Sequence, residues 1–146
     1  MKTTCVLLAA LALVVSGPLA SQEKDTKLDP AKLVGKWQYV SGVKNGEKIA
    51  EDNLKEPVII AKDKITLKGK DLFVFKYEID AAKKPAAIEL EMLESPFGAG
   101  AKASGIIELK GDELRLCYAA MGGAAPKTFE SKEGSQAHFF VLKRAK

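Results

Sequence analysis

The chain offers few side chains whose chemistry could support catalysis, and its only histidine is the first to consider. His138 stands beside two phenylalanines in a chain of 146 residues. A zinc or copper site needs several His or Cys ligands. A Ser-His-Asp arrangement would have to use this one histidine, and no Gly-x-Ser-x-Gly elbow accompanies it. The sequence therefore predicts a surface or rim position for His138, and it predicts no catalysis, no metal and no cofactor.

Two further patterns resemble chemical sites. Glu89 and Glu91 could be taken as paired carboxylates, but they alternate with apolar residues and so point outward together from a strand. The segment 98–104 is similar to a phosphate-binding loop, yet its lysine does not follow a glycine and a strand is expected where a helix is required. The two glutamates are better explained as part of a solvated strand face, and segment 98–104 as an ordinary loop, than as chemical sites.

A third candidate is the thiol of Cys117. The other cysteine, Cys5, lies near the N-terminus in a segment that we expect to be removed, so no intramolecular disulfide is predicted. A lone cysteine on a strand is usually a small buried hydrophobe. A reactive thiol or an intermolecular disulfide is the alternative.

Large apolar and aromatic residues give the last candidate site, a cavity for an apolar ligand. The same residues could equally fill the interior of a small barrel, because eight strands leave space that is either packed or holds one small ligand. The candidate ligand-lining residues are Tyr39, Phe73, Phe75, Tyr77, Leu90 and Tyr118.

The elements that would position these residues are antiparallel strands. Residues 105–118 contain two alternating apolar-polar runs around the turn Lys110-Gly111-Asp112, which is typical of a β-hairpin. Asp29 followed by Pro30 predicts a helix N-cap, with a short helical turn from Pro30 to Val34 before the first strand. The expected strands are 36–43, 58–61, 64–68, 72–79, 87–93, 105–109, 113–118 and 138–143.

One face of several of these strands is apolar, as with Trp37, Tyr39 and Val43 in the first. Such a one-sided sheet buries its apolar face most simply by closing on itself. We therefore predict an all-β fold, a small antiparallel up-and-down barrel of about eight strands. Two longer loops interrupt it, 95–104 and 119–137, and the second is long enough to fold over an end of the barrel.

The N-terminus predicts export. An apolar run from Val6 to Val15 follows Lys2 and precedes small residues, which is typical of a secretory signal peptide. The predicted organisation is a signal peptide at 1–20, a flexible leader at 21–28 and one barrel domain at 29–146. The mature chain has no apolar run long enough to span a membrane, and a periplasmic or extracellular location is expected.

The charge pattern argues against nucleic acid as a partner. The formal net charge is +4, and lysines are interleaved with nineteen acidic residues along the chain. Arg115 and Arg144 are the only arginines, whereas nucleic-acid proteins gather Arg and Lys on one face.

Several motifs resemble a known family. Gly35-Lys36-Trp37 is similar to the Gly-x-Trp signature of the lipocalins, in which a basic residue of the last strand packs across the tryptophan at one end of the barrel; Arg144 is the matching candidate and Lys143 the runner-up. With residues 84–90, 105–117, 126–129 and 140–144, the chain resembles the lipocalin-like domain family abundant in secreted planctomycete proteins. The resemblance implies an exported barrel without agreed catalytic residues.

Two functional hypotheses follow. The first is an exported lipocalin-like binding module that takes up a small apolar molecule at its open end or docks an envelope protein through its loops. The second is a packed barrel that serves as a structural or protein-interaction domain of the cell envelope. An open mouth lined by Tyr39, Phe75 and Tyr77 would favour the first, and a filled interior with a flat apolar patch outside would favour the second.

Overall fold

The protein is an antiparallel β-barrel, as the sequence predicts. A computed structural model describes residues 27–120 and 122–146. The predicted signal peptide and most of the leader lie outside the described residues. The strands of the described part are β1 (Gly35–Lys44), β2 (Glu47–Lys48), β3 (Val58–Ile60), β4 (Lys64–Lys68), β5 (Leu72–Asp80), β6 (Ala86–Glu94), β7 (Lys102–Lys110), β8 (Glu113–Ala119) and β9 (Ala137–Arg144).

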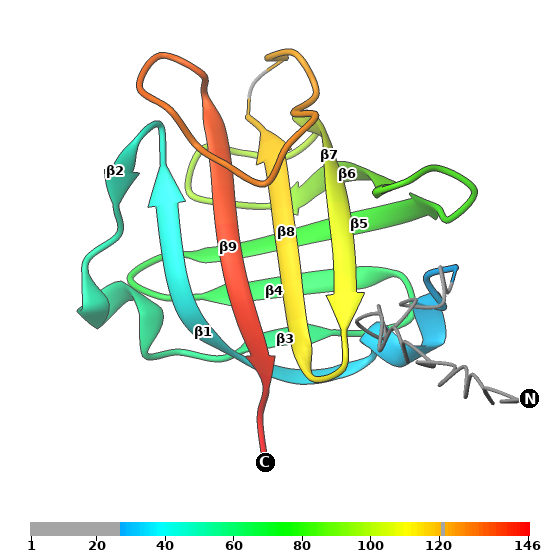
Figure 1. Cartoon of the computed structure of the whole chain (residues 1–146). Helices are drawn as coiled ribbons and strands as arrows, with labels where there is room; N and C mark the ends of the chain where they lie inside the picture. Colours follow the sequence, from blue (N-terminus) through cyan, green and yellow to red (C-terminus); the bar gives the residue numbers. More distant parts are fainter. Residues whose placement is uncertain (1–26, 121) are drawn as a thin grey trace, which may run out of the picture.

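The barrel closes because β9 pairs with β1. Each strand from β3 onward pairs antiparallel with the next one along the chain, and β1 joins both β3 and β9. Strand β2 pairs only with the end of β1, so eight strands form the closed barrel. In Figure 1, β1, β7, β8 and β9 run in front of β3–β6 and roughly across them. The two layers enclose one apolar core.

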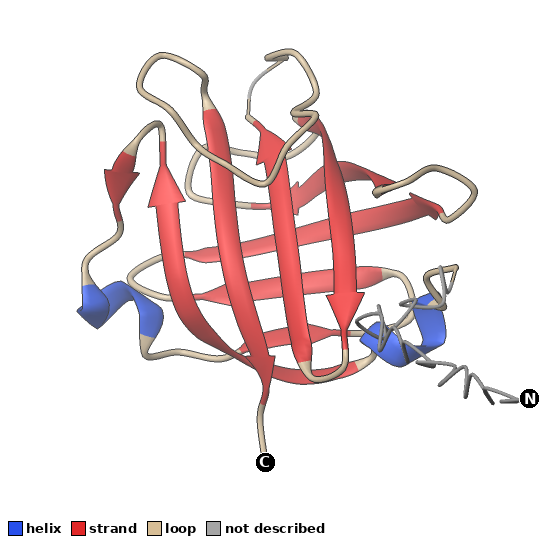
Figure 2. Cartoon of the chain, viewed as in Figure 1, coloured by secondary structure: helices blue, strands red, loops and turns tan. Residues whose placement is uncertain are grey.

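Helical structure in the described part is limited to two short 3-10 turns (Figure 2). The first, η1 (Pro30–Leu33), begins at the predicted N-cap, where the Asp29 carboxylate accepts a hydrogen bond from the Ala31 amide at 3.0 Å. The second, η2 (Glu51–Leu54), and strand β2 lie in the connection from β1 to β3 and were not predicted.

The two ends of the barrel differ, and we name them by their contents. The tryptophan end holds the start of β1, the end of β9 and the β3–β4, β5–β6 and β7–β8 turns. The mouth end holds the β1–β3 connection, the β4–β5 turn and the β6–β7 and β8–β9 loops. We use these two names below to say where along the barrel an interior side chain lies.

Strand β1 departs from the predicted alternation. The pairing of β1 with β9 shifts at a β-bulge, since Tyr39 lies opposite Leu142 but Ser41 lies opposite Val141. After the bulge Gly42 takes the inward position and Val43 faces outward. The prediction that Val43 shares the interior face of Trp37 is wrong because a bulge exchanges the two faces of a strand.

Both long loops also differ from expectation. Strand β7 begins at Lys102, so the loop before it is shorter than predicted. The β8–β9 loop, whose residues 122–136 we call the strap, crosses the outer face of β8 and β9 rather than an end of the barrel (Figure 1). Phe129 of the strap packs there against Phe139, with ring centroids 6.2 Å apart.

Candidate ligand site at the mouth of the barrel

The tryptophan end is closed by two side chains. Trp37 is fully buried, and its indole N–H donates to the Leu33 carbonyl at 2.8 Å. The Arg144 guanidinium carbon lies 4.3 Å from the centre of the Trp37 ring, and an N–H of Arg144 donates to the Lys32 carbonyl. Gly35 allows this approach, because a Cβ there would lie 3.2 Å from the guanidinium and its φ is +145°. Trp37 and Arg144 therefore cap this end of the barrel.

The interior toward the mouth end is lined by five rings, which we call the aromatic cluster. Tyr118 lies at its centre, with its ring centroid 5.1 Å from that of His138 and 6.2 Å from those of Phe75 and Phe140. Tyr39 joins from β1 at 5.5 Å from Phe140. Adjacent strands bring these residues together, because Tyr118 pairs with His138 and Leu116 with Phe140 between β8 and β9.

The polar atoms of the cluster are uncharged at neutral pH. His138 Nδ1 and the Tyr118 hydroxyl are 3.2 Å apart, within hydrogen-bond distance. Burial, and to a lesser extent the charge of Lys44, lowers the pKa of His138 to about 4. Burial raises the pKa of Tyr39 to about 12 and raises the pKa of Tyr118 as well. The Tyr39 hydroxyl has no hydrogen-bond partner among the described residues, so it is free to bond a ligand.

Half-buried apolar side chains surround the cluster at the mouth end. We call this set the rim; it consists of Ile49, Leu67, Phe73, Met92 and Ala103. Ile49 comes from the β1–β3 connection and leans over Gly42, where a Cβ would lie 2.8 Å from the Ile49 Cδ1. Met92 alternates with Leu90 in the sequence and could have been predicted, whereas no strand pattern marks Ile49.

The six residues predicted to line a cavity divide into two groups. Tyr39 and Phe73 are half-buried at the mouth end. The Tyr77 hydroxyl donates to the Ala61 carbonyl at 2.7 Å, beside the β3–β4 turn at the tryptophan end. Four of the six are at most 6% exposed and belong to the packed core: Phe75, Tyr77, Leu90 and Tyr118.

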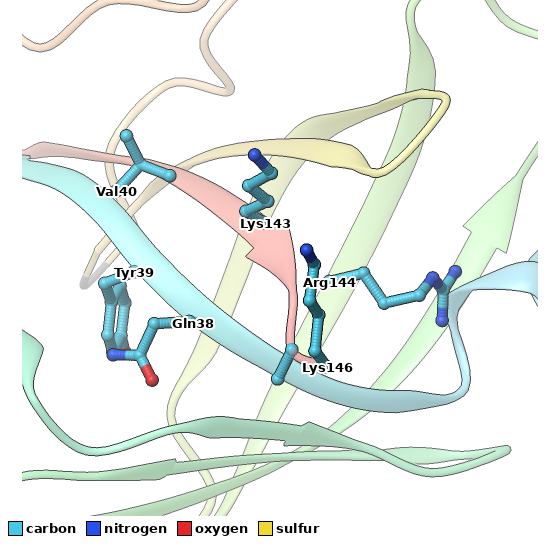
Figure 3. Close-up of a pocket in the computed structure, with 7 residues that line it drawn as sticks. Gln38, Tyr39, Val40, Lys143, Arg144 and Lys146 are labelled. Carbon is cyan, nitrogen blue, oxygen red and sulfur yellow. The ribbon is translucent and has the colours of Figure 1, made fainter.

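Two depressions stand out on the described part of the protein, and both lie outside the barrel. One of about 400 Å³ lies along β1 and the end of β9 (Figure 3), and the other, of about 160 Å³, lies at the strap. The side chains of the inner core are at most 6% exposed, so a ligand at the mouth would have to rest on the aromatic cluster among the rim residues.

Neither a metal-binding cluster nor a membrane-spanning helix occurs among the described residues. No group of three His, Cys, Asp or Glu residues within 27–120 and 122–146 could hold a metal ion. The same residues include no helix long and apolar enough to cross a membrane.

A second, smaller apolar cluster lies beneath the strap. Cys117, Ile106 and Ala137 face outward from β7–β9 but are buried by Phe129 and the neighbouring chain. The Cys117 thiol is free and lies 3.4 Å from the Glu130 carbonyl, and burial raises its pKa. A thiol in this setting is a packed core group, the first of the two interpretations that the sequence allows.

Comparison with known proteins gives no match to a family model, to a curated protein or to a solved structure. The resemblance to the lipocalin-like domain family therefore stays a prediction, and only the barrel is shown.

Proposed function

We propose that the protein is an exported lipocalin-like binding module that takes up a small, uncharged, largely apolar molecule at the mouth end. One observation carries the proposal: half-buried apolar side chains gather at that end around the aromatic cluster, next to the unpartnered Tyr39 hydroxyl. Concave sites that combine apolar walls with a few polar groups are typical of small-molecule binding. The tryptophan end, by contrast, is sealed by Trp37 and Arg144.

The chemistry of the mouth selects an uncharged ligand. No buried charged side chain lies in the described core, and the titratable groups of the aromatic cluster, Tyr39, Tyr118 and His138, are neutral at pH 7; the nearest charge, that of Lys44, lies on an exposed side chain. An ion placed there would lose its hydration without gaining a partner of opposite charge. A hydroxyl or carbonyl group on an apolar body would instead bond Tyr39.

Native mass spectrometry tests the proposal. The protein is purified without unfolding and examined for bound mass that disappears on denaturation; binding of the neutral fluorescent probe N-phenyl-1-naphthylamine is measured alongside. Leu67→Gln at the rim is expected to weaken probe binding about tenfold by removing apolar contact. Leu109→Gln is the matched control, because Leu109 is also half-buried but lies at the tryptophan end. Equal effects of the two changes, or no binding at all, would contradict the proposal.

The second candidate is a packed interaction domain. It is favoured by the filled interior and by Phe97, which is 87% exposed on the β6–β7 loop. The other exposed large apolar side chains of the described part are scattered over several elements, from Val34 to Leu93. A clean apo mass together with absent probe binding would favour this candidate.

A further inference from the structure

A shallow groove lies on the outside of the barrel, where β1 runs beside the end of β9. Its volume is about 400 Å³, and residues 38–40 and 143–146 line it. Figure 3 shows the Val40 and Lys143 side chains extending to the same side of the two strands, while Arg144 extends away from them. The bulge after Tyr39 lies at this point, and Val40 is 59% exposed. The groove thus combines an exposed branched apolar side chain with lysine side chains.

The positive charge of the groove is not balanced by ion pairs. Neither Lys143 nor Lys146 forms a salt bridge with any described residue. Glu113 lies opposite Lys143 in the β8–β9 register, but its carboxylate accepts a hydrogen bond from the Arg115 Nε at 2.9 Å. The nearby Asp112 lies 3.7 Å from the Nε of Arg144. Both neighbouring side-chain carboxylates are therefore associated with arginines, and neither of them pairs with the ammonium group of Lys143 or Lys146.

We propose that this groove binds a single-chain alkyl carboxylate, with its chain along Val40 and Ala145 and its carboxylate held by Lys143 and Lys146. The volume lies within the range of about 300–1,000 Å³ typical of small-molecule sites. A monoanion with a short apolar tail matches both the exposed apolar side chain and the excess of positive charge. Tyr39 lines both this groove and the mouth, but the inference does not rest on the proposed function, because the mouth selects uncharged molecules and the groove selects an anion.

Calorimetric titration of the full chain with octanoate, and with octanol for comparison, tests the inference. Octanoate is expected to bind with a dissociation constant on the order of 1 mM, as fits an open groove. The double variant Lys143→Gln with Lys146→Gln is expected to weaken octanoate binding about fivefold to tenfold and to leave octanol binding unchanged. Added salt should weaken octanoate binding to the parent protein in the same direction, because it screens exposed charges.

Two control variants keep the test specific. Lys64→Gln with Lys76→Gln removes the same charge from an exposed pair on β4 and β5 and should leave octanoate binding unchanged. Leu67→Gln at the rim should also leave it unchanged. No octanoate binding up to about 10 mM, or equal weakening by both lysine pairs, would overturn the inference. Loss of octanoate binding in Leu67→Gln would place the carboxylate in the mouth and overturn it as well.

Discussion

Trp37 joins three parts of the chain through one side chain. Its indole N–H bonds the carbonyl of Leu33 in η1, its ring lies under Arg144 of β9, and its backbone pairs with Val58 of β3. The ring is fully buried, and its one polar atom, the indole nitrogen, is hydrogen-bonded. Trp37 therefore stabilises the tryptophan end, and its replacement should lower the unfolding free energy of the whole barrel.

Replacing Trp37 with alanine is expected to cost about 3 kcal/mol or more of unfolding free energy, through lost burial and the cavity left behind. Trp37 is the only tryptophan, so urea denaturation must be followed by far-UV circular dichroism rather than by fluorescence. Trp37→Phe should cost less, because it keeps an aromatic face for Arg144. A loss below about 1 kcal/mol for the alanine variant would argue against the sealing role of Trp37.

His138 makes stability depend on pH in a defined direction. Its pKa falls from 6.5 to about 4 on folding, chiefly through burial, so the unfolded chain binds more protons between these values. Stability is then fully present above pH 6.5 and is lost as the pH falls toward 4. Because the side chain is partly exposed, the loss between pH 6.5 and 4.5 is expected to be about 1–2 kcal/mol.

The single histidine makes this prediction accessible to measurement. An NMR titration of its imidazole protons gives the pKa of His138 in the native state directly. His138→Gln, which keeps a hydrogen-bonding group near Tyr118, should flatten the difference in stability between pH 6.5 and 4.5 relative to the parent. A native-state pKa between 6 and 7 would show that His138 is not held in the neutral form by burial.

At the scale of elements, the parts of the fold with regular alternation could be predicted. The run from Gly105 to Tyr118 places apolar residues on one face of both β7 and β8, and the structure forms that hairpin. Strand β2 and turn η2 could not be predicted, because short segments with mixed polarity carry no periodic signal. The alternation predicts the wrong face for Val43, because nothing in the local sequence marks the bulge before it.

The candidate site could be predicted only in part, for the same reason. Tyr39 and Phe73 follow the strand pattern and lie at the mouth end. Ile49 reaches the rim from a connection, and its contact with Gly42 depends on how that connection folds back over β1. The strap follows no periodicity, so its position over Cys117 comes from tertiary packing.

Gly105 tests the close approach of β7 and β8. A Cβ at this inward position would meet the carbonyl oxygen of Cys117 and would lie 2.7 Å from the Tyr118 Cβ, so the backbone itself would have to move. Gly105→Ala is expected to destabilise the protein by about 2–3 kcal/mol through overpacking. Gly69→Ala is the control, because the nearest atom to its Cβ would be 3.7 Å away. Similar denaturation midpoints for the two variants would contradict this packing.

At the scale of the whole molecule, the barrel carries apolar side chains on both sides of one layer. The inner core is enclosed by strand closure, whereas the outer cluster of Ile106, Cys117 and Ala137 is covered by the strap. Ser131 holds the strap by donating to the Ala137 carbonyl at 2.6 Å and accepting from the Gly46 amide at 3.0 Å. A loop held by a few hydrogen bonds opens more easily than a closed barrel of paired strands. The strap should therefore open more readily over the outer cluster than the strands open around the inner core.

The accessibility of Cys117 measures that difference in stability. In a Cys5→Ser background the Cys117 thiol should react slowly with 5,5′-dithiobis(2-nitrobenzoate), since the side chain is fully buried and only opening of the strap exposes it. Phe129→Ala removes the ring that packs on Phe139, and we expect it to speed the reaction about tenfold while shifting the unfolding midpoint little. Phe97→Ala removes an equally large ring from an exposed loop and should change neither quantity. If Phe129→Ala left the labelling rate unchanged, or if labelling required global unfolding in every variant, the strap would have to be part of the same cooperative unit as the barrel.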